Sequence, residues 1–189
     1  QLRFDDWFKL SNSYQRESSS KENFLRSIDL DIKNFELFGR LFSNQEVIAD
    51  RGAERWIIRL SGEDADGLIN LPYRFDNVQS IVLDMNHLNI KAAHTDWEGN
   101  SLNPLDFPSI SLLIKDFTYS EYSFGLLNGD FSRFDDGLRA VNLETQSKSF
   151  SVNTNAGWVI DKSNNFMQHT YIDGELTSTD TKETLTELG

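Results

Sequence analysis

Residues 27–35 read Ser27-Ile28-Asp29-Leu30-Asp31-Ile32-Lys33-Asn34-Phe35, and the alternation within this stretch predicts the architecture of the whole chain. Isoleucine and leucine occupy every second position, with aspartates between them. Because successive side chains on a β-strand point to opposite faces, the stretch predicts a strand with one apolar and one charged face. Runs with the same period recur at residues 56–60, 81–85 and 110–114.

Four dipeptides with turn-forming composition punctuate these runs. They are Asp66-Gly67, Asn128-Gly129, Asp136-Gly137 and Asp173-Gly174. Asn-Gly and Asp-Gly accept the positive φ that tight hairpins require. The sequence therefore predicts a mainly β protein, built as an extended antiparallel sheet whose strands follow one another with short connections.

The opening stretch recurs in similar form at Ser109–Phe117, and this predicts two related β repeats. A tryptophan-led strand follows each copy, beginning at Trp56 and at Trp158, and each then leads to a strand near a glycine, Gly67 or Gly174. Stacked repeats of this kind bury the apolar face of one unit against the next. A chance similarity between two amphipathic strands is the alternative.

The predicted organisation has four parts. Residues 1–26 form an N-terminal segment and linker, in which an aromatic patch of Phe4, Trp7 and Phe8 would pack on the main body. Residues 27–91 form the first β repeat, residues 92–108 a connecting loop, and residues 109–189 the second β repeat with a C-terminal helix.

The C-terminal helix is predicted from its capping pattern. Asp180 is placed to cap the helix, with Glu183 three residues later, and Leu185 and Leu188 are expected to face inward. Helix is otherwise scarce in the sequence.

Composition excludes several classes of function. The net charge of −12 over 189 residues disfavours nucleic acid as a partner, because phosphate backbones bind to basic surfaces. The absence of cysteine excludes disulfides and thiolate chemistry. No apolar run is long enough to span a bilayer. The chain begins at Gln1 without a signal peptide, and we expect it to be a piece of a longer protein.

No catalytic motif is present, so the sequence predicts a non-enzymatic protein without catalytic residues, metal or cofactor. Asp64 to Gly67 is similar to the start of a calcium loop but lacks its distal ligands, and a hairpin turn is the stronger interpretation. The segment from His94 to Glu98 is interpreted as a solvated loop. Asp29 and Asp31 share one strand face but are interpreted as solvated residues, and Trp56 and Trp158 as structural anchors rather than sugar-binding residues.

The order of short motifs along the chain resembles the AsmA-like superfamily, and within it the YhdP-type proteins of Gram-negative bacteria. The matching elements follow in chain order: Asp5-Asp6-Trp7, the strand Ile28–Ile32 leading to Gly39, Trp56 to Gly62 with Gly67 and Pro72, Asn103–Pro108, Phe124-Gly125-Leu126, Gly157-Trp158, Thr170 and Gly174, and Leu185 to Gly189. One departure is Arg55 before Trp56, where the family more often has glycine.

The resemblance implies a long periplasmic protein anchored in the inner membrane through a helix absent here. It implies that the sheet curls into a trough, or taco-like form, with an apolar inner surface that conducts phospholipid between inner and outer membranes. Expected partners are phospholipid acyl chains and neighbouring segments of the same longer chain.

The alternation itself selects the candidate lipid-groove residues, and the charged positions Asp29, Asp31, Arg59 and Asp84 would then face water. An ordinary β-sandwich core is the alternative reading of the same pattern. A structural or protein-binding β module of an envelope protein, or a carbohydrate-binding sandwich, therefore also stays open. The groove candidates are Ile28, Leu30, Ile32, Ile81, Leu83, Met85, Ile110, Leu112 and Ile114.

Overall fold

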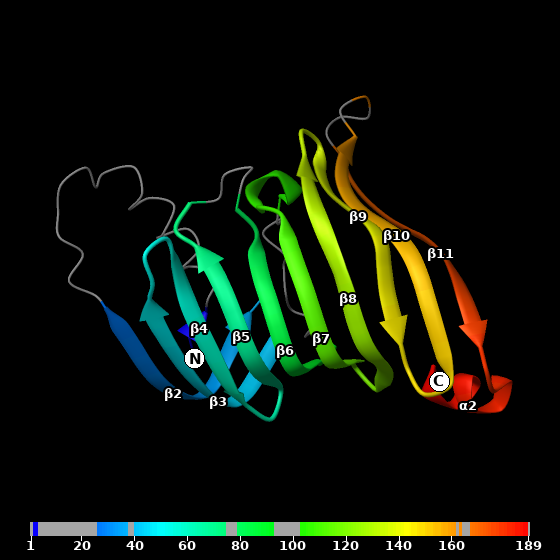
Figure 1. The fold of residues 1–189 in the computed structure, drawn as a ribbon, viewed down its shortest axis with the longest axis horizontal. Coiled ribbons are helices and arrows are strands. Elements are labelled where there is room, and N and C mark those ends of the chain that lie inside the picture. The colour runs from blue at the N-terminus through cyan, green and yellow to red at the C-terminus, as the bar shows by residue number, and fades with distance from the viewer. Residues whose placement is uncertain are drawn as a thin grey trace.

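A computed structural model describes residues 2–3, 26–37, 40–74, 79–92, 103–161, 163 and 167–188 of the chain. Within this part a single sheet of eleven strands follows sequence order from β1 to β11 (Figure 1). The predicted mainly β fold with a short C-terminal helix is confirmed. The elements are β1 (Leu2–Arg3), β2 (Ser27–Leu37), β3 (Arg40–Arg51), β4 (Arg55–Gly62), β5 (Ala65–Pro72), β6 (Ile81–Ile90), the 3-10 helix η1 (Pro104–Asp106), β7 (Ile110–Tyr119), β8 (Tyr122–Phe134), β9 (Gly137–Gln146), β10 (Phe150–Asp161), β11 (Met167–Ser178) and α2 (Thr181–Glu187).

Two predicted features lie outside the described residues. The aromatic patch of Phe4, Trp7 and Phe8 is one, and the loop from His94 to Glu98 is the other.

The prediction of an antiparallel sheet is wrong at one central position. β6 and β7 pair in parallel, with Ile81 opposite Ile110 and Met85 opposite Ile114. The physical reason is the long connection between Ile90 and Ile110, which returns the chain to the end where β6 begins. A parallel pair requires such a crossover, whereas a hairpin turn permits only antiparallel pairing. The short β1 also pairs in parallel with β2, while all other neighbouring strands in the described sheet are antiparallel.

The parallel step divides the sheet into two antiparallel meanders, β2–β6 and β7–β11. The two similar nine-residue stretches form the first strand of each meander, β2 and β7. The two tryptophans do not occupy equivalent strands, because Trp56 begins the third strand of its meander and Trp158 lies in the fourth. The two-repeat interpretation therefore stays a prediction.

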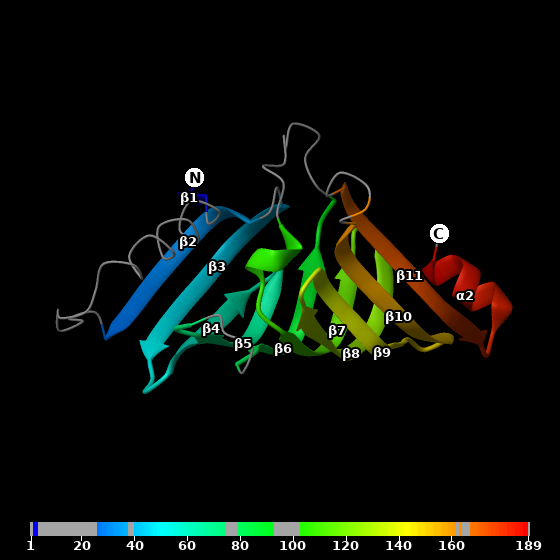
Figure 2. The same ribbon diagram turned by 90° about the horizontal axis from the view of Figure 1, so that it is seen from above.

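The sheet is strongly curved and is not closed into a barrel. Seen from above, β2 and β3 form one side of the curve and β10 and β11 the other, with η1 between them (Figure 2). A contact across the curve confirms the bend: the Arg40 guanidinium at the start of β3 donates to the Lys91 carbonyl after β6 and, at 3.3 Å, to the Tyr119 hydroxyl at the end of β7. In a flat sheet β3 and β7 are four strand positions apart, so the start of β3 and the end of β7 would be separated by about 19 Å.

The C-terminal helix forms where its cap predicts it. The Asp180 carboxylate accepts hydrogen bonds from the Lys182 and Glu183 amides, each 3.0 Å, and this satisfies two of the free donors of the first turn. The predicted inward position of Leu185 is wrong, because its side chain is 65% exposed. Thr184 is buried instead, and its hydroxyl donates to the Ser149 carbonyl at 3.0 Å.

Candidate functional site

The strand register brings all nine predicted groove residues onto one face of the sheet. On β6 and β7 they are direct partners, in three successive pairs from Ile81 with Ile110 to Met85 with Ile114. On β2, Ile28 and Leu30 stand opposite Ala49 and Val47, and the same side continues through β4 and β5. Side chains that are paired across strands share a face, so these residues form one surface, which we call the apolar face.

A row of cross-strand partners shows the extent of the apolar face. It runs over ten strands, and only one glycine and one threonine interrupt its series of apolar side chains. The row consists of Leu30, Val47, Leu60, Gly67, Met85, Ile114, Leu127, Thr145, Val152 and Leu176.

The apolar face is the concave face of the sheet. Trp158 belongs to it, because it pairs with Leu138 and Thr170 in step with Val152. The ring of Trp158 lies 5.5 Å from that of Phe107, which directly follows η1. Figure 2 places η1 inside the curve of the sheet. The Arg133 guanidinium also holds this segment, by donating to the Leu105 carbonyl at 2.7 Å.

Part of the apolar face is closed by the protein itself. Met85 is 1% exposed and Ile114 2%, and both belong to one core cluster with Leu127, Phe35 and Phe42. The rings of Phe35 and Phe42 stack at 4.9 Å on the hairpin of β2 and β3. The curvature brings this hairpin over β6–β8, so its aromatic rings cover the lower end of the concave side. We call this part the sealed region.

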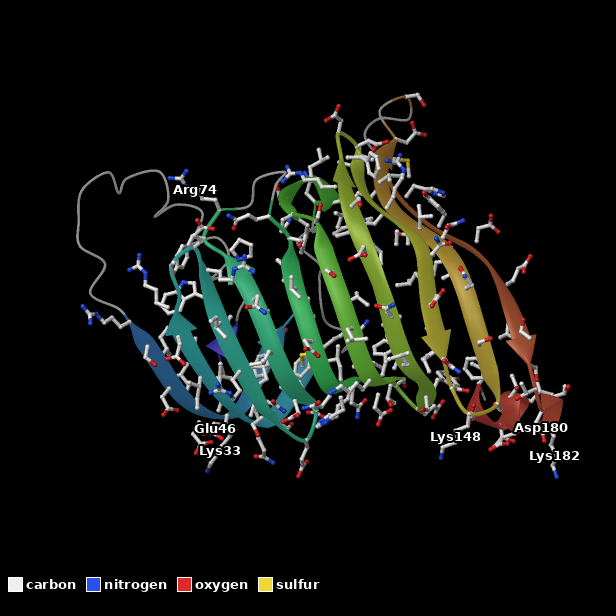
Figure 3. The ribbon with its side chains drawn as sticks, in the orientation of Figure 1. Lys33, Glu46, Arg74, Lys148, Asp180 and Lys182 are labelled. Atoms are coloured by element: carbon white, nitrogen blue, oxygen red, sulfur yellow. The ribbon has the colours of Figure 1, made fainter. Side chains whose placement is uncertain are left out.

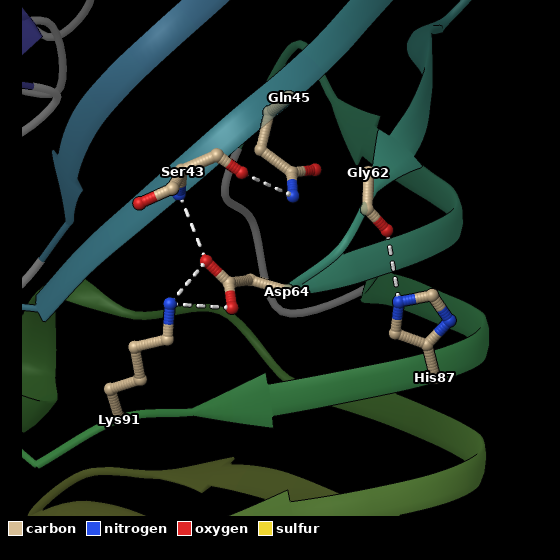
Figure 4. Close-up of polar contacts among 6 residues, drawn as sticks. All are labelled: Ser43, Gln45, Gly62, Asp64, His87 and Lys91. Atoms are coloured by element: carbon tan, nitrogen blue, oxygen red, sulfur yellow. Dashed lines mark hydrogen bonds and ion pairs between the residues drawn. The ribbon is translucent and has the colours of Figure 1, made fainter.

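A polar network lies at the same end as the sealed region (Figure 4). The buried Asp64 carboxylate accepts from the Ser43 amide at 2.9 Å and pairs with the Lys91 ammonium at 2.8 Å. His87 contacts the Gly62 carbonyl through Nε2 at 3.0 Å. Lys91 is half exposed, so this ion pair joins the interior to the surface.

The same contacts decide between the two interpretations of Asp64. β4 ends at Gly62 and β5 begins at Ala65, so Asp64 lies in a hairpin turn, but Ala65–Gly67 belong to β5 and the predicted Asp66-Gly67 turn is wrong. Asp66 accepts a hydrogen bond from the Asn86 side-chain amide instead of facing Asp64. Among the described residues, no group of three or more histidine and acidic side chains is placed to hold a metal ion.

The remaining groove candidates are more accessible. Ile32, Leu83 and Leu112 are half-buried against the edge of the core cluster. Ile28, Ile81 and Ile110 are half-buried without belonging to it, and Leu30 is 41% exposed. We call the parts of the apolar face around Ile28, Leu30, Ile81 and Ile110 the open region. Sequence periodicity predicts the shared face but carries no signal that separates sealed from open positions.

The apolar face stays uncovered at the last strand. Ile172 is 75% exposed and Leu176 is 50% exposed, and both stand on the concave side of β11 in register with Ala156 and Val152. Leu30 is similarly exposed on β2, near the opposite edge. Apolar side chains on this face therefore extend to both sides of the described sheet.

The convex face is mostly polar, as the alternation predicts. Asp29, Asp31, Arg59 and Asp84 are all exposed, which confirms that they face water. Charged side chains such as Lys33 and Glu46 project from its lower end (Figure 3). Sequence reasoning missed three exposed apolar residues on this face, Ile57, Leu68 and Leu113, which stand between polar neighbours.

Two ionisable groups with shifted pKa values lie near turns. The hydrogen bonds between Arg139 and Asp136, both 2.7 Å, raise the pKa of the arginine. The hydroxyls of Ser147 and Ser149 each donate to Glu187 at 2.6 Å and lower the pKa of that carboxyl. Glu187 thereby fastens α2 to the turn between β9 and β10. Both sets of hydrogen bonds stabilise the turns between strands or the attachment of α2, and neither set lies on the apolar face.

Comparisons with known proteins complete the description. A family model described as YhdP protein matches residues 1–189. No curated protein and no solved structure matches the chain. In the described part of the chain, none of the helices has the length and hydrophobicity needed to cross a bilayer.

Proposed function

Because the chain belongs to the YhdP family, we propose that its apolar face carries phospholipid acyl chains, as one segment of a longer lipid-transport protein of the bacterial envelope. The whole protein would be anchored in the inner membrane, would span the periplasm and would conduct phospholipid between the inner and outer membranes. Neighbouring segments of the same chain would continue the apolar track on either side. This role needs neither a catalytic group nor a cofactor.

The observation that carries the proposal is the ten-strand row of the apolar face, together with its incomplete closure. An ordinary core would bury such side chains, yet Ile28, Leu30, Ile81 and Ile110 keep accessible surface. Each methylene group removed from water contributes about 0.8 kcal/mol, so an acyl chain gains several kcal/mol by lying on such a surface.

The backbone of the sheet suits this task. Its amide and carbonyl groups are paired between strands, so the concave surface offers a passing chain few unsatisfied polar groups. A ladder of similar aliphatic side chains gives binding energy that is nearly equal from one strand to the next. Small differences between successive positions permit sliding, whereas one deep pocket would hold a single lipid.

The proposal is tested by the lipid content of the protein. The full-length protein, purified from bacterial membranes in mild detergent, is expected to release phospholipid on solvent extraction and to show lipid-bound species in native mass spectrometry. A detergent-matched preparation of an unrelated periplasmic β protein is the control. Recovery of no more phospholipid than in the control would contradict the proposal.

The sealed region favours a second candidate, a non-catalytic structural or protein-binding β module. Met85 and Ile114 are closed by the protein's own phenylalanines, as a scaffold core would be. Cross-linking in cells separates the candidates. A photoreactive residue at Leu30 would attach to lipid if the face is a conduit, and to another protein if it is a binding surface.

A further inference from the structure

We propose that Arg26 and Arg51 form a binding site for the phosphate headgroup of a lipid whose acyl chain lies along β2 and β3. The proposal rests on the proposed function and assigns a headgroup position to it. The chemical group that the site would bind is a phosphate anion. We expect this phosphate to belong to a lipid and not to be a free anion. The proposal is based on a pair of arginines at the end of the open region.

The register places the two arginines together. The Arg51 amide donates to the Arg26 carbonyl at 2.9 Å, which makes the two residues cross-strand partners. Arg26 precedes Ile28 by two positions and Arg51 follows Ala49 by two, so both stand on the apolar face. Like charges directly opposite each other destabilise a strand pair. An anion bound between the two guanidinium groups would accept charge-assisted hydrogen bonds from both.

Charge is unevenly distributed around this site. In a chain with a net charge of −12, the neighbourhood of Arg26 and Arg51 also contains Arg55 and Arg74. Figure 3 shows Arg74 at the upper end of the sheet, away from the sealed region. Among the described residues, the carboxylates at this end include Asp50, which accepts a hydrogen bond from Ser27 at 2.8 Å, and Glu54 in the turn between β3 and β4. Arg26 and Arg51 stand on the apolar face, whereas Arg55 stands on the opposite face.

Two aromatic residues border the pair. Arg51 lies 5.3 Å from the ring centre of Tyr73, and the Tyr73 and Trp56 rings meet edge to face at 6.2 Å. Trp56 is the cross-strand partner of Arg51 on β4. Tryptophan and tyrosine favour boundaries where one side is apolar and the other is wet, as at the headgroup level of a membrane.

The interval between the two arginines and the sealed region is long enough to hold one acyl chain. Along β3 the backbone from Arg51 to the fully buried Gln45 spans about 20 Å, at about 3.3 Å per residue. The hydrocarbon core of a bilayer is about 30 Å thick, so the chains of one leaflet reach about 15 Å. Ile28 and Leu30 line this interval on β2. A lipid with its phosphate at Arg26 and Arg51 would therefore place its chain ends near Leu30 and Val47, before the sealed region begins.

The test compares two arginine pairs that differ in the face they occupy. Arg26→Gln with Arg51→Gln removes the proposed site. Arg55→Gln with Arg74→Gln makes the same charge change at the same end of the sheet, and Arg55 pairs with Pro72 on the opposite face. Both variants should fold, because none of the four arginines is buried, and circular dichroism and thermal melting check this.

The probes are a fluorescent-chain phosphatidic acid, the diacylglycerol with the same chains, and inorganic phosphate. The wild-type chain is expected to bind phosphatidic acid at least tenfold more tightly than diacylglycerol. Arg26→Gln with Arg51→Gln should remove that preference and leave diacylglycerol binding unchanged, whereas the Arg55 and Arg74 variant should keep the preference. Millimolar inorganic phosphate should displace little phosphatidic acid.

Other results would overturn the assignment. Equal binding of both lipids by the wild type, or equal loss in the two variants, rejects the arginine site while leaving the proposed function intact. Displacement of the lipid by inorganic phosphate at micromolar concentration would identify a free-anion site instead. Absence of binding for both lipids would reject the arginine site and the proposed function together.

Discussion

The sealed and open regions of the apolar face are built from the same kind of strand, yet they differ in accessibility. Met85 is 1% exposed and Leu30 is 41% exposed, although both stand in one register row of the sheet. The difference arises from the curvature, which brings Phe35 and Phe42 over one part of the row and leaves the edge at β2 uncovered. Alternation therefore sets which face a residue joins, and curvature sets whether that position is core or surface.

The largest effect is expected in the sealed region. Met85→Glu places a charge among Ile114, Leu127 and the phenylalanines without a partner, which should lower the free energy of unfolding by about 3–5 kcal/mol. Urea unfolding followed by tryptophan fluorescence measures it. A loss below about 1 kcal/mol would mean that this part of the face is accessible to water, and the distinction between the two regions would fail.

The next largest loss in the free energy of unfolding is expected from substitutions in the polar network beside the sealed region. Asp64→Ala leaves the Ser43 amide without its carboxylate acceptor, and leaving a buried donor unsatisfied costs about 1–3 kcal/mol. Asp29→Ala, on the exposed side of β2, is the matched control and should change stability by less than about 0.5 kcal/mol. Equal losses in the two variants would show that the network does not hold this end closed.

In the open region, a charge should affect lipid binding more than folding. Leu30→Glu is expected to change the free energy of unfolding by less than about 1 kcal/mol, because the side chain already reaches solvent. The same variant should lose most phospholipid recovered with the full-length protein, and Asp31→Lys on the other face should not. If Leu30→Glu unfolds the protein, Leu30 is a core residue and the open region is not open.

The smallest effect concerns α2, which belongs to neither region. The pKa of Glu187 is lowered by the hydroxyls of Ser147 and Ser149, so its ionised form stabilises the docked helix. This contribution is complete above the ordinary glutamate pKa and is lost as pH falls through the lowered value. Hydrogen exchange of residues 181–187 should therefore accelerate only in that acidic range. Glu187→Gln should show fast exchange at neutral pH as well, with no change in the sealed region.

Local patterns in the sequence predict much of this structure. The alternation around Ile28 and Ile81 places all nine groove candidates on one face, and the Asp180 cap locates α2. These features depend on neighbouring residues alone, which is why a single sequence contains them. The cap does not determine which side of the short helix faces the sheet, so it does not predict that Leu185 is exposed.

Features that depend on long-range geometry could not be predicted. The closure of Met85 requires the hairpin that carries Phe35 to fold across the sheet, and no local pattern encodes that bend. The parallel pairing of β6 with β7 depends on where a long connection ends. The pairing of Arg26 with Arg51 depends on the register of two strands, which no local pattern encodes.

The parallel pairing of β6 and β7 has a consequence for growth of the sheet. β2 and β7 run in the same direction, because each meander contains an odd number of strands and the step between them preserves polarity. A further five-strand unit added beyond β11 through another such step would start in the same orientation. Units joined by this rule would be related by translation. The length of the sheet would then depend on the number of units, and its two edges would not have to meet.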